Sequence, residues 1–260
     1  MKNKKILISK KIKKPYFSVI TVVKDDEKNI IQTLKSIKNQ TFTNFEYIII
    51  DGNSTDKTIK KLMKFKNQIN YLLSEKDNGI YFAMNKGLRI SKGKIIVFVN
   101  SGDMLTKNAL KIVKQKFKYH KFDFVFGTVK RHYTKDTIIK YGFNRDRLKY
   151  NFDFATAHST GFYLKRNIYK KIGFFNTFYK CSSDYDIYFK ILLKMKLDGG
   201  YTKKNELIGT VLSGGFSSKV SFFNHLLEET KIRINNNQNL IIVIMIFFNS
   251  VIKAILKKLI

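Results

Sequence analysis

The sequence predicts an α/β fold in which short buried strands alternate with amphipathic helices. Between residues 17 and 100, four apolar segments rich in β-branched residues (17–23, 45–50, 71–73 and 94–100) alternate with segments of helical periodicity. Strands that are apolar along their whole length are typical of a parallel sheet that helices cover on both faces. The alternation therefore predicts a Rossmann-like half, in which ligands bind beyond the carboxyl ends of the strands.

The intervening helices are predicted from the spacing of their apolar residues. In the 26–38 segment one helical face carries Ile30, Ile31, Leu34 and Ile37. Asp25 or Asp26 is its expected N-cap. Thr55 or Asp56 is expected to open the second helix, whose buried stripe would be Ile59, Leu62 and Met63. Residues 79–90 are predicted to form the third helix, just before the strand at 94–100.

Composition limits the classes of protein that fit. The 260 residues are 44% hydrophobic, enough for a buried core. The single cysteine, Cys181, excludes a disulfide-stapled secreted module and indicates a reducing compartment. The formal net charge of +31 attracts polyanions or anionic lipid. Lysine supplies most of that charge and is spread along the chain, whereas nucleic-acid readers favour clustered arginine, so no nucleic-acid partner is expected.

The two ends of the chain differ in character. Residues 1–15 are expected to form a basic N-terminal extension, and their apolar piece, residues 6–8, is too short for a signal peptide. Near the other end, the apolar run 240–248 is interrupted by Asn249 and Ser250 before it reaches the length of a membrane span. This pattern predicts an interfacial helix. Packing on the protein's own core or on a second subunit is the alternative.

Acidic and polar residues gather in the loops that follow the four predicted strands. These loops are 25–27, 51–56, 74–77 and 100–103, in a chain with 19 acidic residues in total. Helix capping explains any one of them. It does not explain all four together, so the loops are predicted to form a binding site at one edge of the sheet.

Several of these segments resemble a known family. Residues 17–23, 29–40 and 46–58 resemble the N-terminal half of family 2 glycosyltransferases, inverting GT-A enzymes that use nucleotide-sugar donors. Residues 74–87 and 100–103 resemble the branch that builds bacterial capsule, colanic-acid-type exopolysaccharide and O-antigen. The resemblance extends from about residue 16 to about residue 216. It implies a GT-A domain over 16–217, with a mixed central sheet, and a helical C-terminal region over 218–260. Within that domain, residues 16–104 would bind the nucleotide and residues 105–217 the acceptor.

The resemblance also implies which residues bind the donor. Asp51 would contact the base and Thr21 would line the nucleotide. Asn85 and Lys86 could meet the ribose or diphosphate, although an exposed helical face explains them nearly as well. The whole predicted donor-binding set is Thr21, Val23, Glu27, Asp51, Asp77, Asn85, Lys86, Asn100, Ser101 and His158.

A metal site is expected in the loop after the fourth strand. By resemblance, residues 100–103 take the position of the family's DxD motif, where carboxylate oxygens bind Mg²⁺ or Mn²⁺. Asn100 stands where aspartate is commonest, and Gly102 removes a second carboxylate. Asp103 is therefore the predicted metal ligand, while Asn100 or Ser101 would contact the sugar or a metal-bound water.

The general base of the reaction is predicted to be Asp184. The segment 182–186 resembles the family's acidic motif that opens a helix, and Asp184 matches the position of the base. Asp186, two residues further on, is the competing candidate, and an N-cap role is the alternative for Asp184. His158 would lie near the donor phosphates or the metal, unless it is a structural histidine. His120, His132 and His225 receive no predicted role.

These features together predict an inverting glycosyltransferase. It would move a sugar from a nucleotide diphosphate donor, expected to be a UDP-sugar, to a glycan or lipid-linked acceptor in bacterial surface polysaccharide synthesis. The expected location is cytoplasmic, with peripheral contact between residues 240–260 and the inner membrane. The alternatives are a non-catalytic protein that binds polyanions or nucleic acid, and a catalytically degenerate nucleotide-binding fold.

Overall fold

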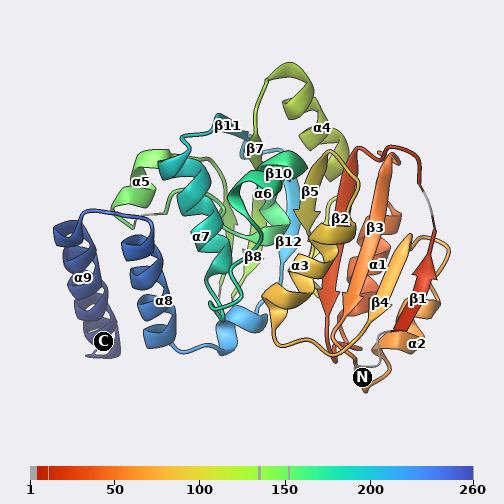
Figure 1. Ribbon diagram of the computed structural model, residues 1–260, viewed down its shortest axis with the longest axis horizontal. Helices are drawn as coiled ribbons and strands as arrows, with labels where there is room; N and C mark the ends of the chain where they lie inside the picture. The colour runs from red at the N-terminus through yellow and green to blue at the C-terminus, as the bar shows by residue number, and fades with distance from the viewer. Residues whose placement is uncertain (1–4, 11, 134–135, 152, 260) are drawn as a thin grey trace.

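The computed structural model describes residues 5–10, 12–133, 136–151 and 153–259. Its centre is a mixed eight-stranded sheet in the order β1-β4-β3-β2-β5-β10-β7-β11 (Figure 1). The strands in that order are Lys5–Ser9, Tyr71–Ser74, Phe45–Asp51, Phe17–Val23, Ile95–Phe98, Phe162–Lys165, Phe124–Phe126 and Gly199–Tyr201. A smaller sheet in the order β6-β12-β8-β9 contains Met104–Leu105, Leu207–Val211, Thr128–His132 and Thr137–Lys140.

The predicted parallel half is confirmed. Strands β4, β3, β2 and β5 run parallel, and every residue of β2 is buried. Along β2, Ile20 and Val22 face one side of the sheet, while Val19 and Val23 face the other. Both faces of this central strand are therefore covered, as its uninterrupted apolar sequence predicts.

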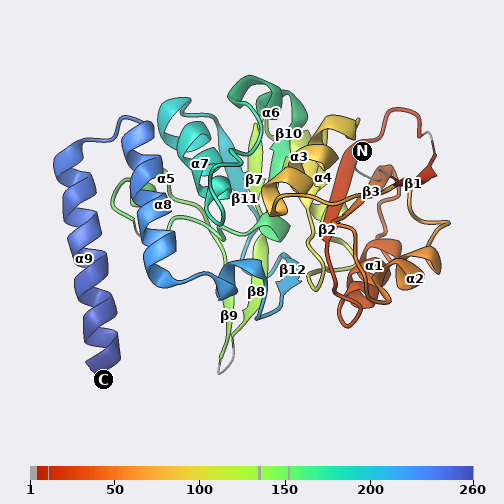
Figure 2. The same cartoon turned by 60° about the horizontal axis from the view of Figure 1, so that its bottom comes forward.

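Helices cover the two faces of the large sheet (Figures 1 and 2). One face packs against α1, α2 and α4, which are Ile30–Lys38, Thr58–Met63 and Ala109–Tyr119. The other packs against α3, α5, α6, α7 and α8, which are Ile80–Ile90, Arg145–Lys149, Arg166–Ile172, Ser183–Phe189 and Phe222–Asn235. Helix α7 continues into a π-helical turn, Lys190–Lys194, and single 3-10 turns occur at Ser159–Gly161 and Phe216–Lys219. This is the layered α/β arrangement predicted from the sequence.

Two predicted helix starts are wrong. Helix α1 begins at Ile30, and the carboxylate of Asp26 accepts hydrogen bonds from Asn29 and Ser101 instead of capping it. Helix α2 begins at Thr58, and its predicted stripe is also wrong at Met63, which is 38% exposed. In both cases the acidic side chain holds the loop at the strand end, because Asp26 accepts from the Ser101 hydroxyl and Asp56 accepts from the backbone amides of Glu27 and Thr58.

The N-terminal segment also differs from the prediction. Residues 1–15 were expected to be an extension, but Lys5–Ser9 forms strand β1 and pairs antiparallel with β4. The pairing satisfies the outer backbone groups of β4, which would otherwise be the edge of the sheet. Lys5–Ser9 is therefore part of the central sheet.

The last two helices form an antiparallel pair at the opposite end of the molecule from β1 (Figures 1 and 2). Helix α8 packs against α7, and α9 (Leu240–Leu259) packs against α8. Val243 is the buried contact of α9, whereas most of its large apolar side chains are exposed. Among the helices of the described residues, none is long and apolar enough to cross a membrane.

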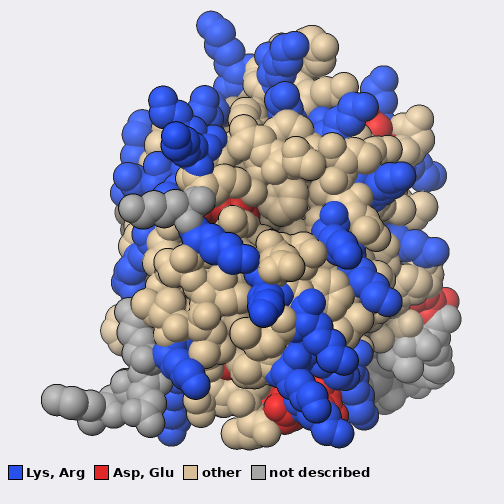
Figure 3. Space-filling model, turned by 90° about the vertical axis from the view of Figure 1, so that its right-hand side faces the viewer, with Lys and Arg blue, Asp and Glu red and all other residues tan. Residues whose placement is uncertain are grey.

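The basic side chains do not gather on the face that contains β1. Figure 3 shows lysine and arginine scattered over that face, with few acidic side chains between them. The positive charge seen in the composition is thus spread over this surface as single side chains.

Candidate active site

A cleft of about 1380 Å³ lies beyond the carboxyl ends of β2 and β5. The 100–103 loop and residues of α3 and α7 line it. Residues from the segments 22–29 and 151–157, Arg131 and His132 of β8, the loop after β12 and two residues of α8 also contribute to the lining. Its position agrees with the prediction that the acidic strand-end loops meet at one edge of the sheet.

Asp103 lies buried in the cleft lining beside His158. Its Oδ2 accepts a hydrogen bond of 2.6 Å from the Thr160 hydroxyl and lies 3.8 Å from Nδ1 of His158. Burial raises the pKa of Asp103 to about 7. Burial, together with the charge of Arg131, lowers the pKa of His158 to about 3. Because Nδ1 of His158 accepts from the Thr160 amide, the imidazole is neutral and the 3.8 Å contact is not an ion pair.

Asn100 and Ser101 stand next to Asp103. The Asn100 amide donates to Ser159 over 3.1 Å, and the Ser101 hydroxyl donates to Asp26 over 2.6 Å. The carbonyl oxygen Oδ1 of Asn100 is buried and has no hydrogen-bond partner among the described residues. A buried acceptor without a donor beside a buried carboxylate fits a hard cation such as Mg²⁺ or Mn²⁺. The described residues contain no group of three or more His, Cys, Asp or Glu side chains that could hold a metal, so a cation here needs oxygens from a ligand.

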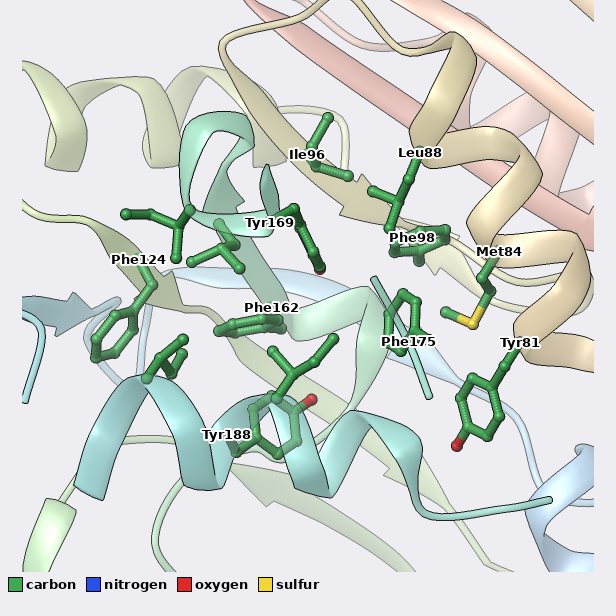
Figure 4. Packing of buried hydrophobic residues seen from close by; sticks show 14 of the residues in the cluster. Tyr81, Met84, Leu88, Ile96, Phe98, Phe124, Phe162, Tyr169, Phe175 and Tyr188 are labelled. Carbon is green, nitrogen blue, oxygen red and sulfur yellow. The ribbon is translucent and has the colours of Figure 1, made fainter. Parts of the chain in front are cut away.

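Asp184 lines the same cleft as the 100–103 loop and lies in the first turn of α7. Its Oδ1 accepts a hydrogen bond of 3.2 Å from the Tyr81 hydroxyl and one of 3.0 Å from the Tyr185 amide. Tyr81 is held in turn by Phe175, which stacks on its ring at 5.4 Å (Figure 4). Burial raises the pKa of Asp184, as expected for a carboxylate prepared to take up a proton.

Asp186, the competing candidate for the base, lies outside the described cleft lining. It is buried, its Oδ1 accepts from Asn236 over 2.8 Å, and its Oδ2 pairs with Lys190 at 2.7 Å. Two residues along a helix point in different directions, and here Asp186 faces α8. The geometry favours Asp184.

A family model described as "Glycosyl transferase family 2" matches residues 18–183, which include Asp103 and end one residue before Asp184. The chain belongs to glycosyl transferase family 2. This result confirms the family predicted from the sequence, and with it a glycosyltransferase activity.

Similar proteins come from several bacteria and an archaeon. A "PGL/p-HBAD biosynthesis glycosyltransferase" of Mycobacterium tuberculosis is 28% identical over 179 residues, covering 66% of this chain and 68% of that protein. TarS of Staphylococcus aureus, a poly(ribitol-phosphate) β-N-acetylglucosaminyltransferase, is 34% identical over 100 residues, covering 36% of this chain and 18% of TarS.

Solved structures confirm the GT-A fold. The structure of S. aureus TarS 1–349 in complex with UDP has a TM-score of 0.67 at 19% identity, covering 86% of this chain and 66% of that one. The mannosyltransferase PcManGT from Pyrobaculum calidifontis, in complex with GDP-Man and Mn²⁺, has a TM-score of 0.65 at 14% identity, covering 91% of this chain and 68% of that one. At these identities the likeness concerns the fold.

Five of the predicted donor-binding residues of this family 2 glycosyltransferase lie outside the described cleft lining, and three of them are buried. The Thr21 hydroxyl donates to the Val99 carbonyl over 2.7 Å. Both carboxylate oxygens of Asp51 accept from the hydroxyls of Ser54 and Ser74. The Asn85 amide bonds the backbone of Phe175 in both directions, at 2.8 and 2.9 Å. These contacts show that the three side chains hold the backbone around the cleft, and the donor contacts predicted for them stay predictions.

The other two are partly exposed and have partners of their own. Lys86 forms an ion pair with Glu75 at 2.8 Å, and the Glu27 carboxylate accepts from the Lys57 amide over 3.1 Å. Both hold loops at the strand ends. Of the remaining set, Val23, Asp77, Asn100, Ser101 and His158 line the cleft.

The cleft also contains residues that the sequence analysis missed, namely Arg131, His132, Tyr188, His225 and Glu229. The two histidines had been given no role. Helical spacing could have pointed to Tyr188 and Glu229. Tyr188 lies one helical turn after Asp184, and Glu229 lies one turn after His225. No sequence signal marks Arg131, since its strand is brought to the cleft by the fold.

Proposed function

We propose that this glycosyltransferase moves a sugar from a UDP-sugar to a hydroxyl group of a glycan or lipid-linked acceptor, with inversion at the anomeric carbon. The observation that carries the proposal is that the Asp184 carboxylate and the oxygen-rich 100–103 loop face the same cleft. Structural neighbours in complex with UDP and with GDP-Man support a nucleotide-sugar donor. The named relatives support a role in bacterial glycan synthesis.

In the proposed reaction Asp184 takes the proton from the acceptor hydroxyl. The acceptor oxygen forms a bond to the anomeric carbon, while the bond from that carbon to the diphosphate oxygen breaks on the opposite face. The electron pair leaves with the nucleoside diphosphate, and the proton remains on Asp184 until solvent removes it. A buried carboxylate with a raised pKa suits this step, because its charged form is poorly solvated and accepts a proton readily.

The donor diphosphate is proposed to lie at the 100–103 loop. Asp103 and the unpartnered Oδ1 of Asn100 would hold Mg²⁺ or Mn²⁺ there, and such an ion, when bound, neutralises charge on the departing diphosphate. Ser101 and neutral His158 border the same space, and Arg131 supplies positive charge close to Asp103. Val23 and Asp77 line the neighbouring part of the cleft and remain proposed donor contacts.

Isothermal titration with UDP and GDP, each with and without Mn²⁺, tests the donor site. We expect UDP to bind, and to bind more tightly when Mn²⁺ is present. In a separate assay with a UDP-sugar and acceptors, we expect the protein to release UDP. Binding without any turnover would indicate the catalytically degenerate alternative. Absence of nucleotide binding by folded protein would refute the proposal and leave polyanion binding by the lysine-rich surface as the function to examine.

The Tyr188 hydroxyl is proposed to contact the transferred sugar. Tyr188 lines the cleft and is 2% exposed, and its buried hydroxyl has no hydrogen-bond partner among the described residues. Burial raises the pKa of Tyr188, the charge of Asp184 adds to the rise and that of Arg131 opposes it, so both charged groups act on this hydroxyl. A sugar bound there for transfer would provide the Tyr188 hydroxyl with a hydrogen-bond partner.

Tyr188→Phe is expected to lower kcat/KM by about tenfold, the value of one lost hydrogen bond to the substrate. The free energy of unfolding should stay the same or rise by up to about 1 kcal/mol, because the variant removes a buried group without a partner. Donor kinetics and thermal unfolding measure the two effects. A destabilised variant with unchanged kinetics would show that the hydroxyl is structural.

We also propose that α9 lies on an anionic membrane surface. Its exposed apolar side chains are Leu240, Ile241, Ile244, Met245, Phe248, Ile252, Ile255 and Leu256. The formal net charge of +31 complements an anionic lipid surface, and an amphipathic helix binds there through buried apolar area together with charge. A lipid-linked acceptor would then meet the enzyme at that surface.

Replacing both Ile244 and Phe248 by serine is expected to lower binding to phosphatidylglycerol vesicles by at least about tenfold in a sedimentation assay. Both side chains are more than half exposed, so the fold should tolerate the change. Tyr119→Ser, at an exposed aromatic residue of α4, is the matched control. Unchanged vesicle binding would argue against the membrane contact. If the unmodified protein is a dimer and the double variant is a monomer, α9 instead contacts a second copy of the chain.

A further inference from the structure

Helix α8 carries three polar residues on one face, spaced by four. His225 and Glu229 line the cleft, and Arg233, 1% exposed, lies in the protein interior next to them. We name His225, Glu229 and Arg233 the α8 row. The row lies beyond residues 18–183, which match the family model, and beyond the 105–217 segment predicted to bind the acceptor.

Arg233 fixes the position of α8 against the cleft. Its guanidinium donates to the carbonyls of Leu148 and Lys149, at 3.1 and 3.2 Å, and to the Asn151 side chain at 3.2 Å. It also bonds the Tyr185 hydroxyl and lies over the Tyr185 ring, 5.5 Å from its centre. Asn151 and Tyr185 both line the cleft, so one buried cation joins α8 to two further parts of the cleft wall.

The other two members of the α8 row stand next to the proposed base. Helix α8 packs against α7, which carries Asp184 in its first turn, and the Glu229 side chain is hydrogen-bonded to Asn151. Burial raises the pKa of Glu229. His225, Glu229 and Asn151 thus line the same cleft as Asp184, on and beside the helix that packs against α7.

In a displacement with inversion, the attacking oxygen and the leaving oxygen lie on opposite faces of the anomeric carbon. The base contacts the attacking oxygen, so groups beyond the base, away from the diphosphate site, surround the acceptor. Carboxylate, imidazole and amide side chains that converge in a cleft are suited to the neighbouring hydroxyl groups of a sugar.

We infer that His225 and Glu229 of the α8 row, with Asn151, form the subsite for the acceptor sugar, and that Arg233 positions them. The inference rests on the proposed function and adds to it the part of the chain that recognises the acceptor. Glu229 accepts hydrogen bonds from sugar hydroxyls, and His225 lies between Glu229 and the base.

The test measures the binding of four methyl β-glycosides by saturation-transfer NMR, with UDP and Mn²⁺ present. The four are the glycosides of glucose, galactose, N-acetylglucosamine and mannose. Methyl glycosides lack a chain that could adhere to α9. We expect at least one to bind, and Glu229→Gln to weaken its binding by about tenfold, since a hydrogen bond to a charged group is lost. The affinity for UDP should change by less than about twofold, because the donor is proposed to lie at the 100–103 loop and not at the α8 row.

Glu206→Gln is the matched control, since that carboxylate pairs with Lys116 outside the described cleft lining. It should leave glycoside binding unchanged. His225→Asn is the second variant and should weaken glycoside binding in the same way, with thermal unfolding recorded for both variants. Failure of the unmodified protein to bind UDP would refute the proposed function itself. UDP binding with no glycoside binding, or glycoside binding that both variants retain, would overturn the assignment of the α8 row.

Discussion

Asp184→Asn is expected to lower kcat by about 10² to 10⁴, the usual contribution of a general base. The amide keeps the size of the side chain and can still accept from Tyr81 and the Tyr185 amide, so the cleft should keep its shape. It cannot take up the proton of the acceptor hydroxyl. The affinity for UDP should be unchanged, since the nucleoside diphosphate is proposed to lie at the 100–103 loop and Asp184 is assigned to the acceptor hydroxyl. Steady-state transfer rates and UDP titration measure the two quantities.

Asp186→Asn is the matched control, two residues away on the same helix. Its carboxylate is paired with Lys190 and hydrogen-bonded to Asn236, so the variant should lose stability, not the chemical step. If Asp186→Asn lost kcat with an unchanged melting temperature while Asp184→Asn kept it, the two assignments would be reversed.

The dependence of kcat on pH provides a second view of Asp184. The deprotonated form is the active one, and burial raises its pKa above the ordinary value for aspartate. The rate should therefore be full at high pH and fall as the pH decreases through the raised pKa. The acid limb should lie above the pH of about 4 at which an exposed aspartate titrates. If the acid limb of the kcat profile disappears in Asp184→Asn, and the remaining rate is independent of pH in that range, the limb belongs to the Asp184 carboxyl.

The central strands could be predicted because their sequences are apolar along the whole length. Strand β2 is buried at every residue, and its ends match the apolar segment 17–23. Strand β1 could not be predicted in the same way. Among its five residues Ile8 alone is buried, the segment is rich in lysine, and its partner β4 lies more than 60 residues along the chain. Its place depends on an unpaired sheet edge that appears only when the sheet has formed.

The same distinction applies to the site. The sequence places Asp103 and Asp184 in short motifs with chemical meaning, and both line the cleft. For Thr21 and Asn85 the sequence does not show the structural partners, since a polar residue after or within a buried element can contact groups that lie far away in sequence. The partner of Thr21 is Val99, and that of Asn85 is Phe175. The α8 row was missed because nothing in residues 222–235 indicates that this helix packs beside α7.

Asp103→Asn is expected to abolish the Mn²⁺-dependent part of UDP binding and to lower kcat/KM by about 100-fold. The amide can still accept from the Thr160 hydroxyl, so the loop should keep its conformation, while the negative charge that attracts the cation is lost. Titration of UDP with and without Mn²⁺ measures the effect, and the two curves should coincide in the variant. Asp123→Asn is the control, because that carboxylate pairs with Lys165 outside the described cleft lining. If Asp103→Asn kept the full Mn²⁺ effect, the cation would have to be held by other oxygens, and the role assigned to the 100–103 loop would be wrong.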